Sequence, residues 1–236
     1  MKPILVVQHA ELERPAALGE VLIDAGCELA LLRSDLEPIP ARLDEYSALV
    51  VMGGIMSATS DDGFPARRAE LALLEHALAE SVPTLGVCLG AQLLAAAAGG
   101  RVYRGDELEI GWRPVILTPE AASDPLLAGI GNPVEVFQWH GDTFDLPPDA
   151  VWLGKSSAYP NQAFRVGAAA WGLQFHVEID DDTVESWLAS SPAEAERAPG
   201  GVAAIRSGTR ANAAQRRRVQ ERVGAHFAQL AQRVAS

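Results

Sequence analysis

Residues 83–100 read Pro-Thr-Leu-Gly-Val-Cys-Leu-Gly-Ala-Gln-Leu-Leu-Ala-Ala-Ala-Ala-Gly-Gly, and this stretch decides the fold. The short apolar run Thr84–Val87 predicts a buried strand. Gln92 opens an Ala/Leu-rich helix, which Gly99 and Gly100 can terminate. A buried strand followed directly by a helix indicates an α/β fold.

Cys88 lies at the turn between this strand and this helix, and Gly86 and Gly90 flank it in a Gly-x-Cys-x-Gly pattern. A sharp strand-to-helix turn needs neighbours with little or no side chain, so the pattern predicts a nucleophile elbow that carries sulfur. The start of a helix favours the thiolate through the helix dipole and the free N–H groups. A buried structural cysteine is the competing interpretation. The two glycines, with a strand and a helix on the correct sides, favour a nucleophile.

Strands and helices alternate in the first 100 residues. Hydrophobic periodicity predicts strands at Ile4–Gln8, Glu28–Arg33 and Tyr46–Met52 and helices at Arg14–Ala25 and Pro65–Glu80. This alternation predicts a mostly parallel sheet that is covered on both faces. Ligand sites in such sheets form at the carboxyl ends of strands. The residues at these ends are His9, Gly53, Gly54 and Cys88.

The pattern changes after residue 100 to short β-like runs that are separated by Pro, Gly and Asp. These runs are Arg101–Arg104, Trp112–Leu117, Val134–Trp139, Val151–Ser156, Gln162–Val166 and Ala168–Phe175. They predict antiparallel strands that extend the sheet, followed by helices at Asp180–Ala189 and Arg210–Val234 with a break at Ser190–Gly201. The expected fold is therefore a three-layer, flavodoxin-like α/β domain over residues 1–190, with a helical extension packed on it over residues 191–236.

Composition limits the classes of protein that fit. The 236 residues are 48% hydrophobic and 21% charged, which is enough apolar material for a full core. The apolar runs are shorter than the roughly 20 residues that a membrane span needs, and the first strand begins too early for a signal peptide. Two cysteines, Cys27 and Cys88, argue against a disulfide scaffold, and no zinc-site spacing is present. We expect a cytoplasmic protein without metal or cofactor.

Charge is unevenly distributed along the chain. The net charge is −12, yet residues 197–236 carry eight arginines and one acid, Glu221. The strongly acidic remainder argues against nucleic-acid binding, and the basic segment lacks interleaved aromatic residues. We therefore expect the Arg-rich helix to dock on this chain or on a second copy of it, which leaves a homo-oligomer open.

A second motif completes a candidate catalytic set. Residues 169–178 read Ala-Ala-Trp-Gly-Leu-Gln-Phe-His-Val-Glu, a strand that ends in His176-x-Glu178. Residues two apart in an extended segment point to the same side, so the imidazole and the carboxylate can lie together. In a nucleophile–base–orienter relay, His176 takes the thiol proton and later protonates the leaving amine, while Glu178 fixes the tautomer of the imidazole.

Four motifs resemble the class I (triad-type) glutamine amidotransferases over roughly residues 1–190. They are Val50-Val51-Met52-Gly53-Gly54, Gly86-Val87-Cys88-Leu89-Gly90-Ala91-Gln92, Trp139-His140-Gly141-Asp142 and Gly172-Leu173-Gln174-Phe175-His176-Val177-Glu178. The resemblance implies a catalytic triad of Cys88, His176 and Glu178. It also implies an oxyanion hole made by the backbone N–H groups of Gly54 and Leu89. The substrate-binding residues that it implies are Gly53, Gln92, His140 and Gly141.

The resemblance leaves three functions open. The first is a glutaminase that releases ammonia for a separate synthetase subunit. The second is a γ-glutamyl peptidase or hydrolase that uses the same triad, and the third is a non-catalytic binding module. The intact triad argues against the third. Ile55 stands where many members carry Pro, so the conformation of the loop at the oxyanion hole is not given by the motif.

Three further residues have structural interpretations. Cys27 falls in an amphipathic segment and is expected in the core. His9 follows the first strand, where a ligand could reach it, but a structural hydrogen bond is the favoured interpretation. Asp142 is expected to cap its turn or to orient His140.

Overall fold

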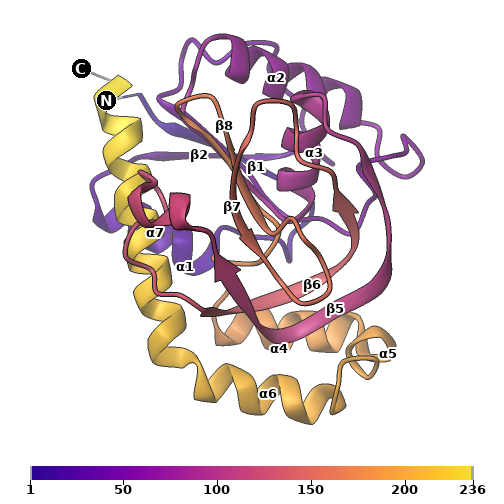
Figure 1. Cartoon of the computed structure of the whole chain (residues 1–236). Helices are drawn as coiled ribbons and strands as arrows, with labels where there is room; N and C mark the ends of the chain where they lie inside the picture. The colour runs from indigo at the N-terminus through magenta and orange to yellow at the C-terminus, as the bar shows by residue number, and fades with distance from the viewer. Residues whose placement is uncertain (1, 235–236) are drawn as a thin grey trace.

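The computed structural model describes residues 2–234 and contains a single nine-stranded sheet with helices on both sides (Figure 1). The strands are β1 Ile4–Gln8, β2 Leu29–Arg33, β3 Ala48–Val51, β4 Thr84–Val87, β5 Val102–Leu117, β6 Val134–Phe144, β7 Val151–Lys155, β8 Ala163–Val166 and β9 Ala170–Leu173. The helices are α1 Ala16–Asp24, α2 Arg67–Ala79, α3 Leu89–Ala97, the 3-10 helix η1 Pro119–Ser123, α4 Asp181–Ser190, α5 Pro192–Ala195, α6 Gly201–Ala211 and α7 Ala213–Val234.

The sheet has a parallel half and an antiparallel half, in the order β2-β1-β3-β4-β9-β8-β7-β5-β6. Strands β2, β1, β3, β4 and β9 run parallel, and β1, β3, β4 and β9 are buried along their whole length. Strands β9, β8, β7, β5 and β6 pair in antiparallel fashion. The predicted α/β architecture with an antiparallel extension is therefore confirmed.

Alternate side chains of the parallel strands enter two cores on opposite faces of the sheet. Ile4 and Val6 pack with the apolar faces of α1 and α7, whereas Leu5 and Val7 pack with α2 and α3. This alternation is the two-residue period of a strand. Cys27, with 7% of its surface exposed, belongs to the first core, as the sequence predicted.

Strand β5 departs from the sequence prediction. The runs Arg101–Arg104 and Trp112–Leu117 belong to one 16-residue strand and not to two. The polar residues 105–109 lie between them because β5 leaves the main sheet and pairs with β6 as a two-stranded ribbon, with a shift of register between Arg104 and Glu109. Strand β9 ends at Leu173, which is earlier than predicted, and His176 continues in a single bridge to Phe137 of β6.

A third core joins the ribbon to the C-terminal helices. Ile110 and Phe137 of the ribbon pack with Leu188 of α4 and Ile205 of α6, beneath the sheet as drawn in Figure 1. The predicted break at Ser190–Gly201 contains the short helix α5, and helix α6 begins at Gly201, before the predicted helix start at Arg210. A Cβ at Gly208 would contact the indole of Trp112, so glycine here permits the close packing of α6 on β5.

The Arg-rich segment makes contacts within the chain. Arg206 pairs with Glu185 of α4 at 2.7 Å, and Arg216 pairs with Asp181 at the start of α4 at 2.7 Å. Phe227 of α7 is fully buried in the first core. The division into two parts at residue 190 remains our proposal. Within residues 2–234, no helix is long and apolar enough to cross a membrane.

Asp124 provides a test of how the antiparallel half is held. Its buried carboxylate accepts hydrogen bonds from Trp171 Nε1 of β9 at 2.9 Å, from Arg165 Nε of β8 at 2.9 Å and from the N–H groups of Leu126 and Leu127. We expect Asp124→Ala to lower the free energy of unfolding by about 3–5 kcal/mol, since it leaves a partly buried guanidinium and buried donors unpaired. Urea denaturation measures this, and a loss below about 1 kcal/mol would contradict it.

The exposed Asp62 supplies the control for this variant. We expect Asp62→Ala to change the stability by no more than about 0.5 kcal/mol. The isosteric Asp124→Asn keeps one oxygen acceptor, so its loss of stability should lie between those of Asp62→Ala and Asp124→Ala.

Candidate active site

Cys88 forms a strained turn between β4 and α3. Its backbone has φ 51° and ψ −105°, a conformation that non-glycine residues rarely adopt and that is often found at functional sites. Its N–H donates to the carbonyl of Leu173 at 2.8 Å, which fixes the elbow to the end of β9. A Cβ at Gly90 would meet the carbonyl of Val51, and one at Gly86 would meet the carbonyl of Gly90. The elbow predicted from the flanking glycines is therefore present.

The helix after the elbow begins at Leu89, three residues before the predicted start at Gln92. Cys88 is thus the N-cap residue, and the N–H of Leu89 belongs to the first helical turn, where N–H groups have no intrahelical acceptor. Cys88 is 6% exposed and its sulfur lies on the wall of a cavity. That the N–H of Leu89 contributes to an oxyanion hole stays a prediction.

His176 and Glu178 form a buried pair close to Cys88. His176 Nδ1 lies 2.6 Å from Glu178 Oε1, and the N–H of His176 donates to Phe137 of β6 at 2.9 Å. The other ring nitrogen, Nε2, has no hydrogen-bond partner among the described residues. Burial acts to lower the pKa of His176, but its interactions with Glu178 and Cys88 outweigh this effect and raise the pKa to about 10. This raised pKa favours the imidazolium form of the ring at neutral pH.

The loop after β3 borders this pair. A Cβ at Gly53 would lie 3.4 Å from His176 Cε1 and 3.6 Å from the Cβ of Cys88, so the backbone of Gly53 lies directly beside both side chains. The carbonyl of Gly53 accepts from His9 Nδ1 at 2.7 Å. Carbonyl and N–H point in opposite directions across a trans peptide, so His9 also fixes the direction of the Gly54 N–H.

His9 is itself held by a buried carboxylate. Its Nε2 lies 2.9 Å from Glu70 Oε2 of α2, and both side chains are almost fully buried. Burial acts to lower the pKa of His9, but the hydrogen bond and charge of Glu70 outweigh it and leave this pKa raised. The structural hydrogen bond predicted for His9 is confirmed, and its acceptor is the loop that carries Gly54.

The side chains implied for substrate binding cluster around Asp142 at the end of β6. Gln92 Nε2 donates to the carbonyl of Asp142 at 3.2 Å and to Gln174 Oε1 at 3.2 Å. His140 Nδ1 bonds the same carbonyl at 2.9 Å, and its Nε2 faces the buried Glu109 at 3.2 Å. Asp142 therefore orients His140 through its backbone carbonyl.

The carboxylate of Asp142 has separate partners. It accepts from Ser57 Oγ at 2.9 Å and from Arg104 Nη1 at 3.2 Å. The guanidinium of Arg104 lies over Gly141, where a Cβ would touch it. The carboxylate of Asp142 and the guanidinium of Arg104 therefore lie together at this end of the cavity, where both charges of a zwitterionic ligand could be bound.

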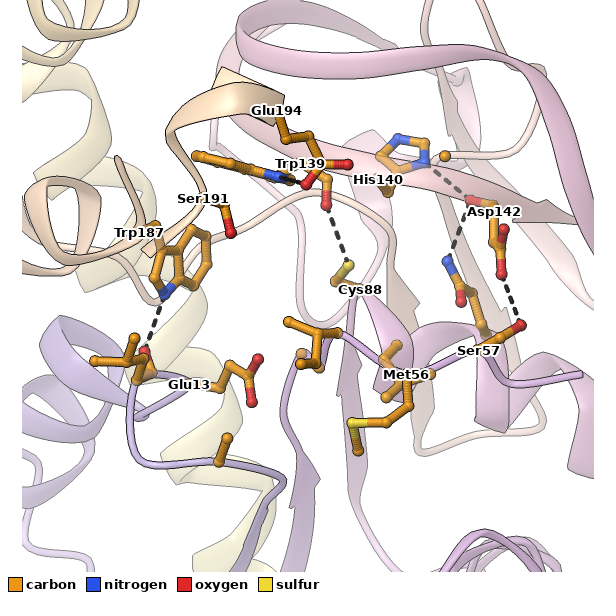
Figure 2. Close-up of a pocket in the computed structure, with 18 of the residues that line it drawn as sticks. Glu13, Met56, Ser57, Cys88, Trp139, His140, Asp142, Trp187, Ser191 and Glu194 are labelled. Atoms are coloured by element: carbon orange, nitrogen blue, oxygen red, sulfur yellow. Dashed lines mark hydrogen bonds between the residues drawn. The ribbon is translucent and has the colours of Figure 1, made fainter. Parts of the chain in front are cut away.

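Cys88 lines a cavity of about 670 Å³ and lies between the two sides of this cavity in the view of Figure 2. His140, Asp142, Ser57 and Met56 lie on one side of it in this view, and residues that the sequence did not reveal lie on the other. Trp139, from a motif that the sequence analysis quoted, lies above the sulfur, and the residues that the sequence did not reveal are Glu13, Trp187, Ser191 and Glu194. No motif marks them, because they come from the β1–α1 loop and from α4 and α5. Among residues 2–234, no group of three or more His, Cys, Asp or Glu side chains could hold a metal ion.

The family model of glutamine amidotransferase class-I matches residues 16–187. The chain belongs to this family. The matched segment runs from α1 to α4 and so includes the elbow, the His176–Glu178 pair and the Asp142 cluster.

Relatives and solved structures agree with this membership. The chain is 35% identical over 167 residues to the glutamine amidotransferase-like protein YfeJ of Salmonella typhimurium, a match that covers 70% of each chain. It superposes on the crystal structure of a glutamine amido transferase from Methylobacillus flagellatus with a TM-score of 0.89 and 33% identity, over 98% of this chain and 95% of the other. A Thermotoga maritima glutamine amidotransferase gives a TM-score of 0.81 at 32% identity, over 94% and 97% of the two chains.

A synthase is also among the relatives of this chain. The glutamine-hydrolyzing GMP synthase of Porphyromonas gingivalis is 37% identical over 143 residues, which are 60% of this chain and 26% of the synthase. The match therefore spans about a quarter of that protein.

The two cysteines of this chain allow a direct test of thiol reactivity. Cys88 lies on the cavity wall beside the His176 imidazolium, whereas burial raises the pKa of the Cys27 thiol. We expect a glutamine-like chloroketone to alkylate Cys88 at least about tenfold faster than Cys27 at neutral pH. Peptide mass mapping after brief treatment measures the ratio. Preferential labelling of Cys27 would show that Cys88 is an inert core thiol.

The charge of Glu178 should be visible in the pH dependence of activity. The raised pKa of His176 means that its protonated form is present at neutral pH and is lost as the pH rises through about 10. We expect the alkaline limb of kcat/KM on glutamine to lie well above pH 6.5, the ordinary pKa of histidine. In Glu178→Gln the alkaline limb should move down by about one pH unit or more, because the substitution removes a negative charge beside the His176 ring. An unchanged limb would mean that Glu178 does not act on the titrating group.

Proposed function

We propose that this chain is a cysteine-dependent amide hydrolase that acts on the side-chain amide of glutamine. One observation carries the proposal: the strained Cys88 lies beside a buried imidazolium whose Nδ1 is 2.6 Å from Glu178, on the wall of a ligand-sized cavity. Nucleophilic amide hydrolysis needs a nucleophile, a proton carrier and a group that orients the carrier. The three residues fit these roles in that order.

The proposed reaction has two halves. The Cys88 sulfur attacks the γ-amide carbon, and the negative charge on the amide oxygen is stabilised by the N–H groups of Gly54 and Leu89, each worth about 10²–10³ in rate. His176 gives its proton to the departing amine as the C–N bond breaks, which leaves a γ-glutamyl thioester. Water then attacks the thioester with His176 as the base and releases glutamate.

The Asp142 cluster supports glutamine as the acyl donor. The positive guanidinium of Arg104 can pair with the α-carboxylate of glutamine. The negative carboxylate of Asp142 can pair with the α-ammonium group of the same molecule. Gln92, His140 and Gly141 shape the floor between this cluster and Cys88.

We also propose a destination for the released ammonia, a synthetase on a separate chain. The related glutamine-hydrolyzing GMP synthase of P. gingivalis supports it. A second relative, one subunit of the glutamine-hydrolyzing GMP synthase of Thermococcus kodakarensis, is 31% identical over 144 residues, which are 60% of this chain and 74% of the other. A cytoplasmic location and a homo-oligomeric state remain predictions.

The cavity favours a second candidate, a γ-glutamyl hydrolase. Glutamine is a small amino acid, whereas cavities of roughly 300–1,000 Å³ enclose considerably larger ligands. The volume of about 670 Å³ therefore leaves room for a leaving group larger than ammonia.

Variants of the triad test the proposed reaction. We expect Cys88→Ala and His176→Ala to abolish release of ammonia from glutamine and of amine from γ-glutamyl amides, while Glu178→Gln keeps a rate lowered by orders of magnitude. Steady-state kinetics with circular dichroism measures turnover and folding together. Cys27→Ala is the matched control and should turn over as the wild type does. Activity in Cys88→Ala would refute the proposed nucleophile.

A further inference from the structure

The side of the cavity opposite Asp142 has its own chemistry. Glu13, Trp139, Trp187 and Glu194 form this side, which we call the amine lobe (Figure 2). Trp139 Nε1 donates to Glu194 Oε2 at 2.9 Å, and Trp187 Nε1 donates to the carbonyl of Leu12 at 3.0 Å. The two indole N–H groups are therefore already used. A ligand in the amine lobe can therefore contact the faces of the two indole rings and the carboxylate oxygens of Glu13 and Glu194.

Glu13 is the polar group in the lobe that lacks a full set of partners. Its side chain lies in the cavity wall and only 8% of the residue is exposed. The N–H of Ile55 donates to its carboxylate, but Oε2 has no hydrogen-bond partner among the described residues. Burial raises the pKa of Glu13, against the opposing charges of His9 and His176. A buried carboxylate of this kind is stabilised by a cationic donor.

The neighbouring arginines do not supply that donor. Arg33 is near enough to act on Glu13 through its charge, but it pairs with Asp35 at 2.6 Å and does not line the cavity. Arg104 does line the cavity, but it is bound to Asp142 on the opposite side. Glu11 and Glu194 add negative charge to the lobe.

We propose that the amine lobe binds the leaving group of the substrate and selects γ-glutamyl amides whose leaving amine carries a second positive charge, such as a diamine. The inference rests on the second candidate of the proposed function, a γ-glutamyl hydrolase, and specifies the class of amine that leaves from its substrate. Glu13 Oε2 accepts from the distal ammonium, and the faces of Trp139 and Trp187 attract the same charge. The His176 ring centre lies 4.8 Å from that of Trp187, so the lobe begins where the protonated amine departs.

The chemical step is unchanged by this selection. The bond from the γ-carbon to the amine nitrogen breaks, the thioester to Cys88 forms, and the amine leaves with the proton from His176. Water then restores the thiol and yields glutamate. The distal ammonium takes no part in bond making and affects only binding of the substrate and the transition state.

Three substrates of equal reach test the charge preference. The leaving amines are 1,4-diaminobutane, butylamine and 4-aminobutanoate, which carry a positive, a neutral and a negative distal group. We expect kcat/KM of the full chain to be at least about tenfold higher for the γ-glutamyl diamine than for the butylamide, and lowest for the 4-aminobutanoate amide. In Glu13→Gln the ratio of the first two should fall to near one. The exposed Glu45, which lies outside the cavity, supplies the control, and Glu45→Gln should keep the wild-type ratio.

A second measurement needs no variant and so covers the case in which Glu13→Gln does not fold. Free 1,4-diaminobutane should inhibit the wild-type hydrolysis of the γ-glutamyl diamine competitively and more strongly than butylamine does. Equal rates across the three substrates, or a preference for the anionic leaving group, would overturn the amine lobe and leave the proposed function intact. Absence of turnover and of any thioester on Cys88 with glutamine and all three amides would overturn the proposed function itself.

Discussion

The hydrogen bond from the N–H of Cys88 to the carbonyl of Leu173 closes the parallel pairing of β4 with β9, and the candidate active site depends on it. Because these two strands are neighbours and in register, the elbow after β4 and the His176 segment after β9 emerge at the same edge of the sheet. The bridge from His176 to Phe137 then attaches the antiparallel ribbon to that edge and places the carbonyl of Trp139 3.8 Å from the Cys88 sulfur.

The parts of this arrangement that the sequence predicted are those with a local signal. Strands β1, β3 and β4 are short apolar runs because they are buried on both faces, and such runs can be recognised without tertiary information. The elbow was recognisable because its sharp turn requires glycine at positions 86 and 90. The pairing of His176 with Glu178 followed from their spacing of two residues.

The remaining features depend on contacts between distant segments. Residues 104–108 of β5 are exposed or half-buried, so burial imposes no apolar pattern on them and the strand was divided into two. Helix α6 contains Gly208 because Trp112 packs against it, and a residue chosen for packing contradicts local helix propensity. Glu13 and Glu194 reach the cavity through the placement of a loop and of helix α5, so neither has a neighbouring motif to mark it.

The amine lobe draws only part of its residues from outside the segment that matches the family model, since Trp139 and Trp187 lie within that segment, as does the Asp142 cluster. The family match ends at residue 187, whereas Glu194 lies beyond it and Glu13 lies before its start at residue 16. Sequence drift in these flanking segments can therefore alter which amine is accepted while the elbow, the imidazolium and the Asp142 cluster stay constant. In this architecture, substitutions that change the preferred substrate can arise without changes in the residues that carry out the reaction.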